Sequence, residues 1–201
     1  PFHTQHAYLE QSLGGGSKSL TIYVNGNFRM ACATENMPLR EVPAALTKEV
    51  LQERIESFAL SLKNDFGIDA PRVAVLSLNP RIEGQDSFGQ EEEEVIKPVI
   101  QELSQQKVLC FGPYSINQFV GQEEYHHFDG VMAMYHDQGL AVFNTMSYEG
   151  GVVYTAGLPI VRTAPVFSAQ SGIEDQGIDE TPLRKAIYLA IDIDRNTACE
   201  A

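Results

Sequence analysis

The sequence has few basic residues, few cysteines and no long apolar run. Its 201 residues carry 14 Lys and Arg against 27 Asp and Glu, which gives a formal net charge of −13. So large a negative charge argues against nucleic acid and anionic membranes as partners, because both are themselves negatively charged. It does not exclude a phosphorylated small molecule, which a helix dipole or a single Arg or Lys can bind.

The other scarce features also exclude classes of protein. No apolar stretch approaches the ~20 residues of a transmembrane helix, and no basic-then-apolar leader is present. The cysteines are three in number and widely spaced, at Cys32, Cys110 and Cys199. The first two lie within apolar runs, so we expect buried free thiols and a cytoplasmic protein. Because the chain begins at Pro1 and its first residues resemble mid-domain sequence, we expect a fragment or a processed form.

Hydrophobic patterning predicts an α/β fold. Two β-like runs, 20–24 and 28–33, flank an Asn-Gly turn and predict a hairpin. Apolar residues recur at three- and four-residue spacing between Thr47 and Phe66, which indicates a long amphipathic helix capped by Thr47. The continuous apolar run 72–78 is typical of a buried parallel strand.

In the rest of the chain, predicted strands again alternate with predicted helices. After 72–78 comes a loop and then a helix that opens on four glutamates, 91–94, which we expect to form mostly a solvated face. Further strands are expected at 108–111, 131–134, 150–155 and 160–163. Helices are expected within 1–13, where the helix begins after His3 and has His6 in its first turn, after His136, and at 183–195, the last with Leu183, Ile187, Ala190 and Ile191 on one face.

The strand at 131–134 ends in a run of polar residues, Tyr-His-Asp-Gln-Gly. A histidine followed by an aspartate at the carboxyl end of a buried strand lies where open α/β sheets place ligands and catalytic groups. His136 can give an imidazole nitrogen to a divalent metal, and Asp137 can supply an oxygen ligand or orient the ring. A plain helix start, with Asp137 as a first-turn acid, accounts equally well for these residues taken alone.

Four other residues are candidates. His3 and His6 lie near the start of the first helix and can be metal ligands, although surface histidines at a chain terminus are commoner. Arg162 and Thr163 end a predicted strand and can hold a phosphate or carboxylate. An ion pair to one of the many acids is the alternative for Arg162.

Several motifs together resemble the 4-hydroxythreonine-4-phosphate dehydrogenase family of pyridoxal phosphate biosynthesis. They are Phe-Asp-Gly-Val-Met-Ala-Met-Tyr-His-Asp-Gln-Gly-Leu at 128–140, Gly-Leu-Pro-Ile-Val-Arg-Thr at 157–163, and Ser-Leu-Asn-Pro at 77–80 with Phe-Gly-Gln-Glu-Glu at 88–92. The resemblance covers essentially the whole chain. It implies an α/β/α sandwich lobe of the isocitrate/isopropylmalate dehydrogenase-like fold, within a two-lobed homodimer.

The resemblance also implies an organisation and a chemistry. Residues 1–201 would be the C-terminal portion of the enzyme, with about 1–165 in the second lobe and about 166–201 returning toward the first. A divalent metal (zinc, magnesium or cobalt), held by three histidines, would act as a Lewis acid. NAD would take hydride from 4-phosphohydroxy-L-threonine, a phosphorylated small molecule, and the keto acid formed would lose carbon dioxide.

Carried over by position, the family's site is only partly present. His136 matches a metal histidine, with His3 or His6 as a weaker second ligand, and Asp137 would be a catalytic, ligand-orienting acid. Arg162 and Thr163 would bind substrate, together with Gln176, which stands where the family has a lysine. Phe167 stands where we expect the third histidine.

These departures leave two alternatives to an ordinary dehydrogenase. Losing an imidazole ligand weakens metal binding, since even the loss of a group that only hydrogen-bonds to a ligand lowers metal affinity ~10–100-fold. One alternative is a catalytically impaired paralogue that binds a small molecule. The other is a dehydrogenase of a related phosphorylated hydroxy acid, with the pocket reshaped by the altered loop at 81–85.

Overall fold

The computed structural model describes residues 5–13, 19–81, 89–147, 150–166 and 179–198. Within them, seven strands form one mixed sheet in the order β4-β3-β5-β2-β1-β6-β7. The strands are β1 Leu20–Asn25, β2 Phe28–Thr34, β3 Val73–Leu76, β4 Cys110–Tyr114, β5 Gly130–Tyr135, β6 Gly151–Ala156 and β7 Arg162–Val166. The helices are α1 Gln5–Leu13, η1 Leu39–Glu41, α2 Val42–Ala45, α3 Lys48–Asn64, η2 Glu92–Ile96, α4 Lys97–Gln105, α5 Ile116–Gly121, η3 Glu124–His127, α6 His136–Met146 and α7 Thr181–Ala198.

Strand direction brings most carboxyl ends to one edge of the sheet. The predicted hairpin is confirmed, because β1 and β2 pair antiparallel up to Asn25 opposite Phe28. Gly26 turns the chain there at φ +55°, a conformation that glycine adopts at little cost. β2, β5, β3 and β4 run parallel, and β6 runs antiparallel to β1. The carboxyl ends of β2 to β6 therefore share an edge with the start of β7.

The long amphipathic helix is confirmed as α3. The Thr47 hydroxyl caps it by accepting the N–H of Val50 at 3.3 Å. Its buried apolar residues, spaced by three or four, are Leu51, Ile55, Phe58 and Leu62. Burial of this stripe against the sheet explains why the segment is helical despite its many charged side chains.

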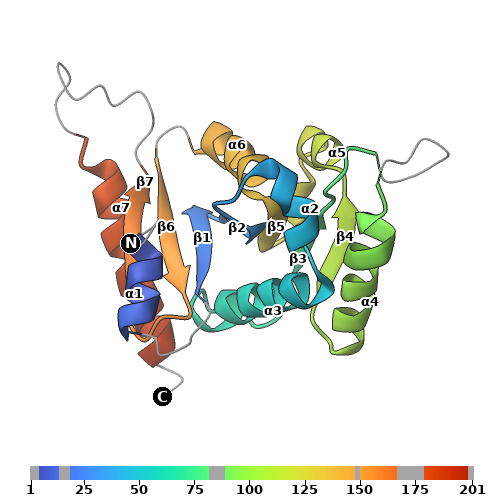
Figure 1. The fold of residues 1–201 in the computed structure, drawn as a ribbon. Helices are drawn as coiled ribbons and strands as arrows, with labels where there is room; N and C mark the ends of the chain where they lie inside the picture. Colours follow the sequence, from blue (N-terminus) through green and yellow to red (C-terminus); the bar gives the residue numbers. More distant parts are fainter. Residues whose placement is uncertain (1–4, 14–18, 82–88, 148–149, 167–178, 199–201) are drawn as a thin grey trace.

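Helices cover both faces of the sheet, which confirms the expected α/β/α sandwich. The side chains of α3, α4 and α7 pack on one face, whereas those of α5 and α6 pack on the other. Figure 1 shows this layering, with α3 below the sheet and α6 above it. Cys32 and Cys110 are buried free thiols, as expected; Cys199 lies outside the described residues.

Three details differ from the sequence expectations. Strand β4 continues through Gly112 and Pro113 to Tyr114 instead of ending before them. The glutamate run is not uniformly solvated, because Glu92 is only 3% exposed and opens a π-helical turn. The apolar face proposed for the last helix includes three residues that are exposed in α7, namely Leu183, Ile187 and Ile191. Among the described helices, none is long and apolar enough to cross a bilayer.

Candidate functional site

A pocket of about 350 Å³ opens at the carboxyl edge of the sheet between β2 and β5. The chain leaves β2 toward α3 on one face and leaves β5 into α6 on the opposite face. Because the two connections part, a crevice remains between the strand ends, which is where open α/β sheets bind ligands. The pocket is lined by Thr34, Glu35, Asn36, Met37, Pro38, Leu39, Val42, Tyr135, His136 and Asp137.

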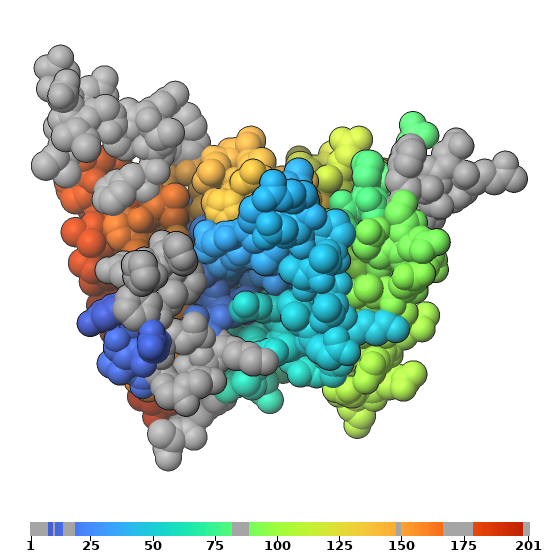
Figure 2. Space-filling model, viewed as in Figure 1, coloured from blue at the N-terminus to red at the C-terminus, as the bar shows by residue number. Residues whose placement is uncertain are grey.

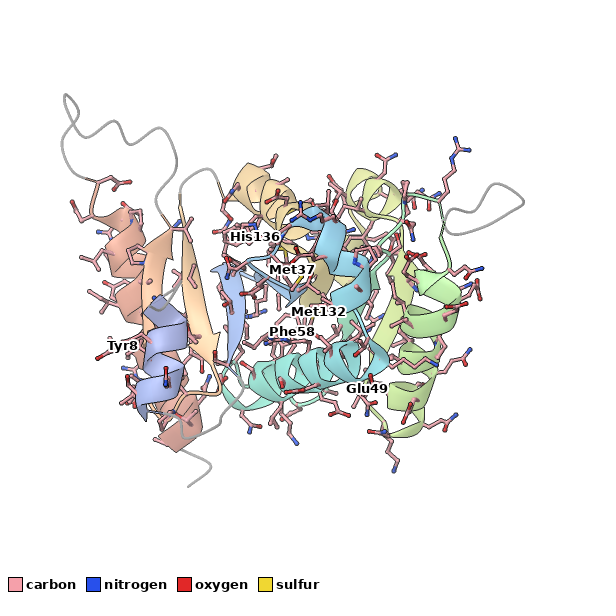
Figure 3. All side chains as sticks on the ribbon, viewed as in Figure 1. Tyr8, Met37, Glu49, Phe58, Met132 and His136 are labelled. Carbon is pink, nitrogen blue, oxygen red and sulfur yellow. The ribbon has the colours of Figure 1, made fainter. Side chains whose placement is uncertain are left out.

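Part of the pocket lining comes from the segment of η1 and α2, which lies on the face of the molecule turned toward the viewer in Figure 2. Figure 2 shows the light-blue segment that contains η1 and α2 standing forward on this face. In Figure 3 the labelled side chains of Met37 and His136 lie near one another, between that segment and α6. Asn36, at φ +53°, turns the chain from β2 into the segment, a conformation that asparagine tolerates better than most residues.

Buried hydrogen bonds fix the ends of the strands. The Thr34 hydroxyl donates to the carbonyl oxygen of Met134 at 2.8 Å and ties β2 to β5. The Gln138 side chain accepts the N–H of Met134 at 2.8 Å and donates to the carbonyl oxygen of Ser77 at 2.7 Å. The glutamine of the Tyr-His-Asp-Gln-Gly motif therefore joins β5 to β3 and holds the first turn of α6 in place.

His136 and Asp137 form a pair at the mouth of the pocket. Nδ1 of His136 lies 2.9 Å from Oδ1 of Asp137. The side chains are 40% and 90% exposed, so a ligand can reach both. A proton held on Nδ1 by the carboxylate leaves the lone pair of Nε2 available to a metal or a substrate hydroxyl.

Glu35 is a site residue that the sequence analysis missed. It follows the last residue of β2, in the position that His136 takes after β5, and it lines the same pocket. Its Oε2 accepts the hydroxyl of Thr21 at 3.1 Å, whereas its Oε1 is buried and has no hydrogen-bond partner among the residues that the structure describes. Burial raises the pKa of Glu35, and the Thr21 hydrogen bond and the charges of Arg54 and His136 offset part of that rise.

The thiol next to this pocket is not a nucleophile. Cys32 is fully buried in β2, and burial together with the nearby carboxylates of Glu35 and Asp137 raises the pKa of its thiol. A thiol held protonated in this way is inert, which agrees with a structural role.

A second pocket, of about 570 Å³, lies along the same edge beyond the ends of β3 and β4. Arg81, Ser115 and Asn117 bring hydrogen-bond donors to it, a set that suits a phosphorylated ligand. The buried carboxylate of Glu92 shapes the adjoining loop, because its Oε1 accepts the N–H of Leu78 at 2.9 Å and that of Asn79 at 2.8 Å.

Arg162 and Thr163 begin β7, and the prediction that they end a strand at 160–163 is wrong, because the strand runs on to Val166. They lie at the same edge of the sheet but away from the first pocket. Three strands separate β7 from β5, which corresponds to roughly 19 Å at the usual strand spacing. Arg162 donates to the hydroxyl of Thr155 at 2.9 Å, and the Thr163 hydroxyl donates to the carbonyl oxygen of Ala186 at 2.9 Å. Both of these hydrogen bonds are therefore made to residues of this lobe.

The other predicted site residues cannot be placed. His3, Phe167 and Gln176 lie outside the described residues, and for His6 the structure describes only its backbone position in α1. Of the histidines predicted as metal ligands, His136 alone has a described side chain. Its exposed ring and its carboxylate partner suit that role.

The pocket offers a cation a mixed donor set. Across the described part of the chain, no three His, Cys, Asp or Glu side chains are close enough to form a metal cluster. The pocket nevertheless combines the imidazole of His136 with the buried, unpartnered Oε1 of Glu35. A bound cation fits these residues, because it would give that oxygen the partner it lacks.

Comparison with known proteins identifies the family. The family model described as pyridoxal phosphate biosynthetic protein PdxA matches residues 1–190. The chain is 48% identical to the 4-hydroxythreonine-4-phosphate dehydrogenase of Bacteroides thetaiotaomicron over 197 residues, which cover 98% of this chain and 54% of that protein. It is 37% identical to the enzyme of the same name from Chromobacterium violaceum, covering 94% of this chain and 58% of that one. The chain therefore spans about half the length of these relatives.

Solved structures agree on the fold. The 4-hydroxythreonine-4-phosphate dehydrogenase from Burkholderia phymatum superposes with a TM-score of 0.78 at 24% identity, covering 96% of this chain and 58% of that one. The enzyme of the same name from Klebsiella pneumoniae gives a TM-score of 0.74 at 23% identity, covering 98% and 57%. The lobe thus has the isocitrate dehydrogenase-like fold expected from its motifs. From the extent of the family match and the identity to these relatives, we conclude that the chain belongs to the PdxA family.

Proposed function

We propose that this chain carries part of the active site of a metal- and NAD-dependent dehydrogenase. The reaction would be the oxidation, with decarboxylation, of 4-phosphohydroxy-L-threonine in pyridoxal phosphate biosynthesis. Family membership and the names of the relatives support this proposal. Because the chain spans about half of those relatives, we assign the activity to the whole enzyme, which we expect to be a homodimer.

The observation that carries the proposal is the His136–Asp137 pair in a pocket at the carboxyl edge of the sheet. Asp137 would keep the proton of His136 on Nδ1 and so orient Nε2 toward the ligand. When bound there, a divalent metal supplies Lewis acidity that stabilises negative charge on the substrate oxygen. Asp137 acts in this scheme through its neighbour and positions the imidazole.

The remaining assignments are proposals of the same kind. We expect the second pocket, with its Arg81 and Ser115 donors, to take a phosphate-bearing ligand, either the substrate or NAD. Arg162, Thr163 and Gln176 are kept as substrate-binding residues, and His3 and His6 as candidate metal ligands. We further propose that about 1–165 form the second lobe and that about 166–201 return toward the first.

The test is an assay of the whole enzyme, to which we assign the activity, with 4-phosphohydroxy-L-threonine, NAD and magnesium, zinc or cobalt, following NADH by absorbance. We expect turnover that His136→Ala abolishes. His127→Ala is a matched control, because His127 is also exposed and also pairs with a carboxylate through Nδ1, that of Glu124 at 3.2 Å. Activity that survives His136→Ala would overturn the assignment of the site.

Substrate choice is tested in the same assay. Turnover of a related phosphorylated hydroxy acid, without turnover of 4-phosphohydroxy-L-threonine, would reassign the substrate while keeping the reaction class. If the whole enzyme turns over neither substrate, under conditions in which the Bacteroides thetaiotaomicron relative is active, the dehydrogenase proposal is contradicted.

A further inference from the structure

We propose that Met37 is a reversible oxidation site in the wall of the first pocket, where peroxide converts its thioether to the sulfoxide and so lowers the activity of the enzyme. The effect on activity rests on the proposed function, whereas the modification itself does not. Neither the motifs nor the comparisons assign a role to Met37.

The first argument is the unequal exposure of the five methionines of the chain. Met37 is 36% exposed. Met30, Met132 and Met134 lie within β2 and β5 and are at most 1% exposed, and Met146, at the end of α6, is half-buried. An oxidant must reach the sulfur atom, so oxidation follows exposure. Met37 is therefore the thioether that is most open to a dissolved oxidant.

The second argument is the position of the side chain. Met37 follows Asn36, the residue at φ +53° that turns the chain out of β2. It lines the same pocket as His136 and Asp137. Figure 3 shows the labelled side chains of Met37 and His136 near one another. A chemical change at the sulfur of Met37 is consequently a change in the wall of the candidate site.

The chemistry needs only a peroxide. A lone pair of the Met37 sulfur attacks one oxygen of hydrogen peroxide, and the O–O bond breaks. The proton of the transferred oxygen goes to the departing hydroxide, which leaves as water. The sulfur is oxidised and the peroxide is reduced. Methionine sulfoxide reductases restore the thioether, one enzyme for each epimer of the sulfoxide, so the change is reversible.

Oxidation makes an apolar part of the pocket wall polar. Pro38, Leu39 and Val42 stand with Met37 in the lining and present apolar side chains. The sulfoxide is polar and chiral, whereas the thioether is flexible and apolar. A ligand that packs against the thioether would instead bury a sulfoxide oxygen, which costs free energy unless a donor reaches it. We therefore expect oxidation of Met37 to weaken ligand binding in the pocket.

The first experiment maps oxidation in the 201-residue chain and requires neither substrate nor activity. The chain is treated with hydrogen peroxide, and the sulfoxide at each methionine is followed in time by mass spectrometry. Met37 should be oxidised at least about tenfold faster than Met132 and Met134, because only its sulfur is exposed. Unfolding the chain in urea before treatment should abolish the difference. Equal rates in the folded chain would overturn the proposal.

The second experiment measures the effect on the whole enzyme. Met37→Leu nearly conserves the volume of the side chain and removes the sulfur. Met146→Leu is the control, because Met146 is half-buried and does not line the pocket. Each protein is treated with peroxide, then with a thiol reductant that reverses disulfide and sulfenic acid formation at cysteines, and is compared with its own untreated sample.

Wild type and Met146→Leu should each lose at least about fivefold in kcat/KM, the effect expected when a polar atom without a partner enters an apolar wall. Met37→Leu should lose much less. Methionine sulfoxide reductases should restore the wild type. A loss that the thiol reductant reverses, or that Met37→Leu shares in full, would assign the effect to another group and overturn the role of Met37.

The two proposals fail in different ways. Unchanged activity of an enzyme whose Met37 is fully oxidised would overturn this inference and leave the proposed function intact. An enzyme that is inactive before treatment would contradict the proposed function, and the oxidation map of the chain would then decide by itself whether Met37 is the oxidation site.

Discussion

The side-chain nitrogen of Gln138 lies 2.7 Å from the carbonyl oxygen of Ser77, and this contact ties the first turn of α6 to the end of β3. The side-chain oxygen of the same glutamine accepts the N–H of Met134 in β5. All three residues are buried. One side chain thereby holds two strand ends and one helix start beside the pocket, which explains a glutamine directly after the His136–Asp137 pair.

Replacing Gln138 by leucine should destabilise the protein by about 2–6 kcal/mol. The substitution keeps the side-chain volume but leaves one buried carbonyl and one buried N–H without partners, at about 1–3 kcal/mol each. Urea unfolding measures the change. Gln101→Leu, on the exposed surface of α4, is the control and should stay close to wild type. A Gln138→Leu variant as stable as the control would show that the two hydrogen bonds contribute little.

Gly139→Ala should destabilise the protein by roughly 1–3 kcal/mol through overpacking. An added Cβ would lie 2.6 Å from the sulfur of Met30 and 3.1 Å from the Cβ of Ala133, and both neighbours are buried. Gly121→Ala is the matched control, because a Cβ there meets nothing within 4 Å. The control should be neutral or gain up to about 1 kcal/mol. Equal effects at the two glycines would contradict the close contact between α6 and β2.

Glu92→Ala should cost about 3–6 kcal/mol, because its carboxylate accepts two backbone N–H groups of the loop after β3 and each such charged bond contributes about 1.5–3 kcal/mol. The comparison is Glu94→Ala, two residues on and exposed, which should change stability by less than about 0.5 kcal/mol. Thermal and urea unfolding of the two variants measure their stabilities and so show whether Glu92 anchors the loop or behaves as a solvated glutamate. Similar melting of the two variants would favour the solvated glutamate.

Local signals predicted most of the fold. The Asn-Gly turn between two β-like runs and the regular apolar spacing of α3 depend on neighbours in sequence, so a single sequence is enough to find them. The same holds for the buried run of β5, which places His136 at a strand end. The motif match then supplied the topology, which periodicity alone could not.

The site was harder to predict because it depends on contacts between distant residues. Glu35 gives no local signal; its importance comes from lying beside His136, 101 residues later, through the pairing of β2 with β5. Glu92 lies in a run of four similar glutamates, and what distinguishes it is the hydrogen bond that it accepts from the N–H of Leu78, 14 residues earlier in the chain. The substrate-binding role of Arg162 stays a prediction, because its hydrogen bond to Thr155 in the neighbouring strand neither supports nor contradicts it.

The stability of Glu35→Gln relative to wild type should rise with pH when no divalent cation is present. Burial raises the pKa of Glu35 above its ordinary value of 4.5, so the folded state holds this proton more tightly than the unfolded state does. The resulting stabilisation is complete below about 4.5 and is lost as the pH rises through the folded pKa, whereas the amide of the variant does not titrate.

The measurement is the free energy of unfolding in urea with a chelator, for both proteins, from below pH 4.5 to neutral pH. The difference between variant and wild type should move in favour of the variant over this range. A difference that is constant with pH would mean that Glu35 ionises as readily in the folded protein as in the unfolded chain.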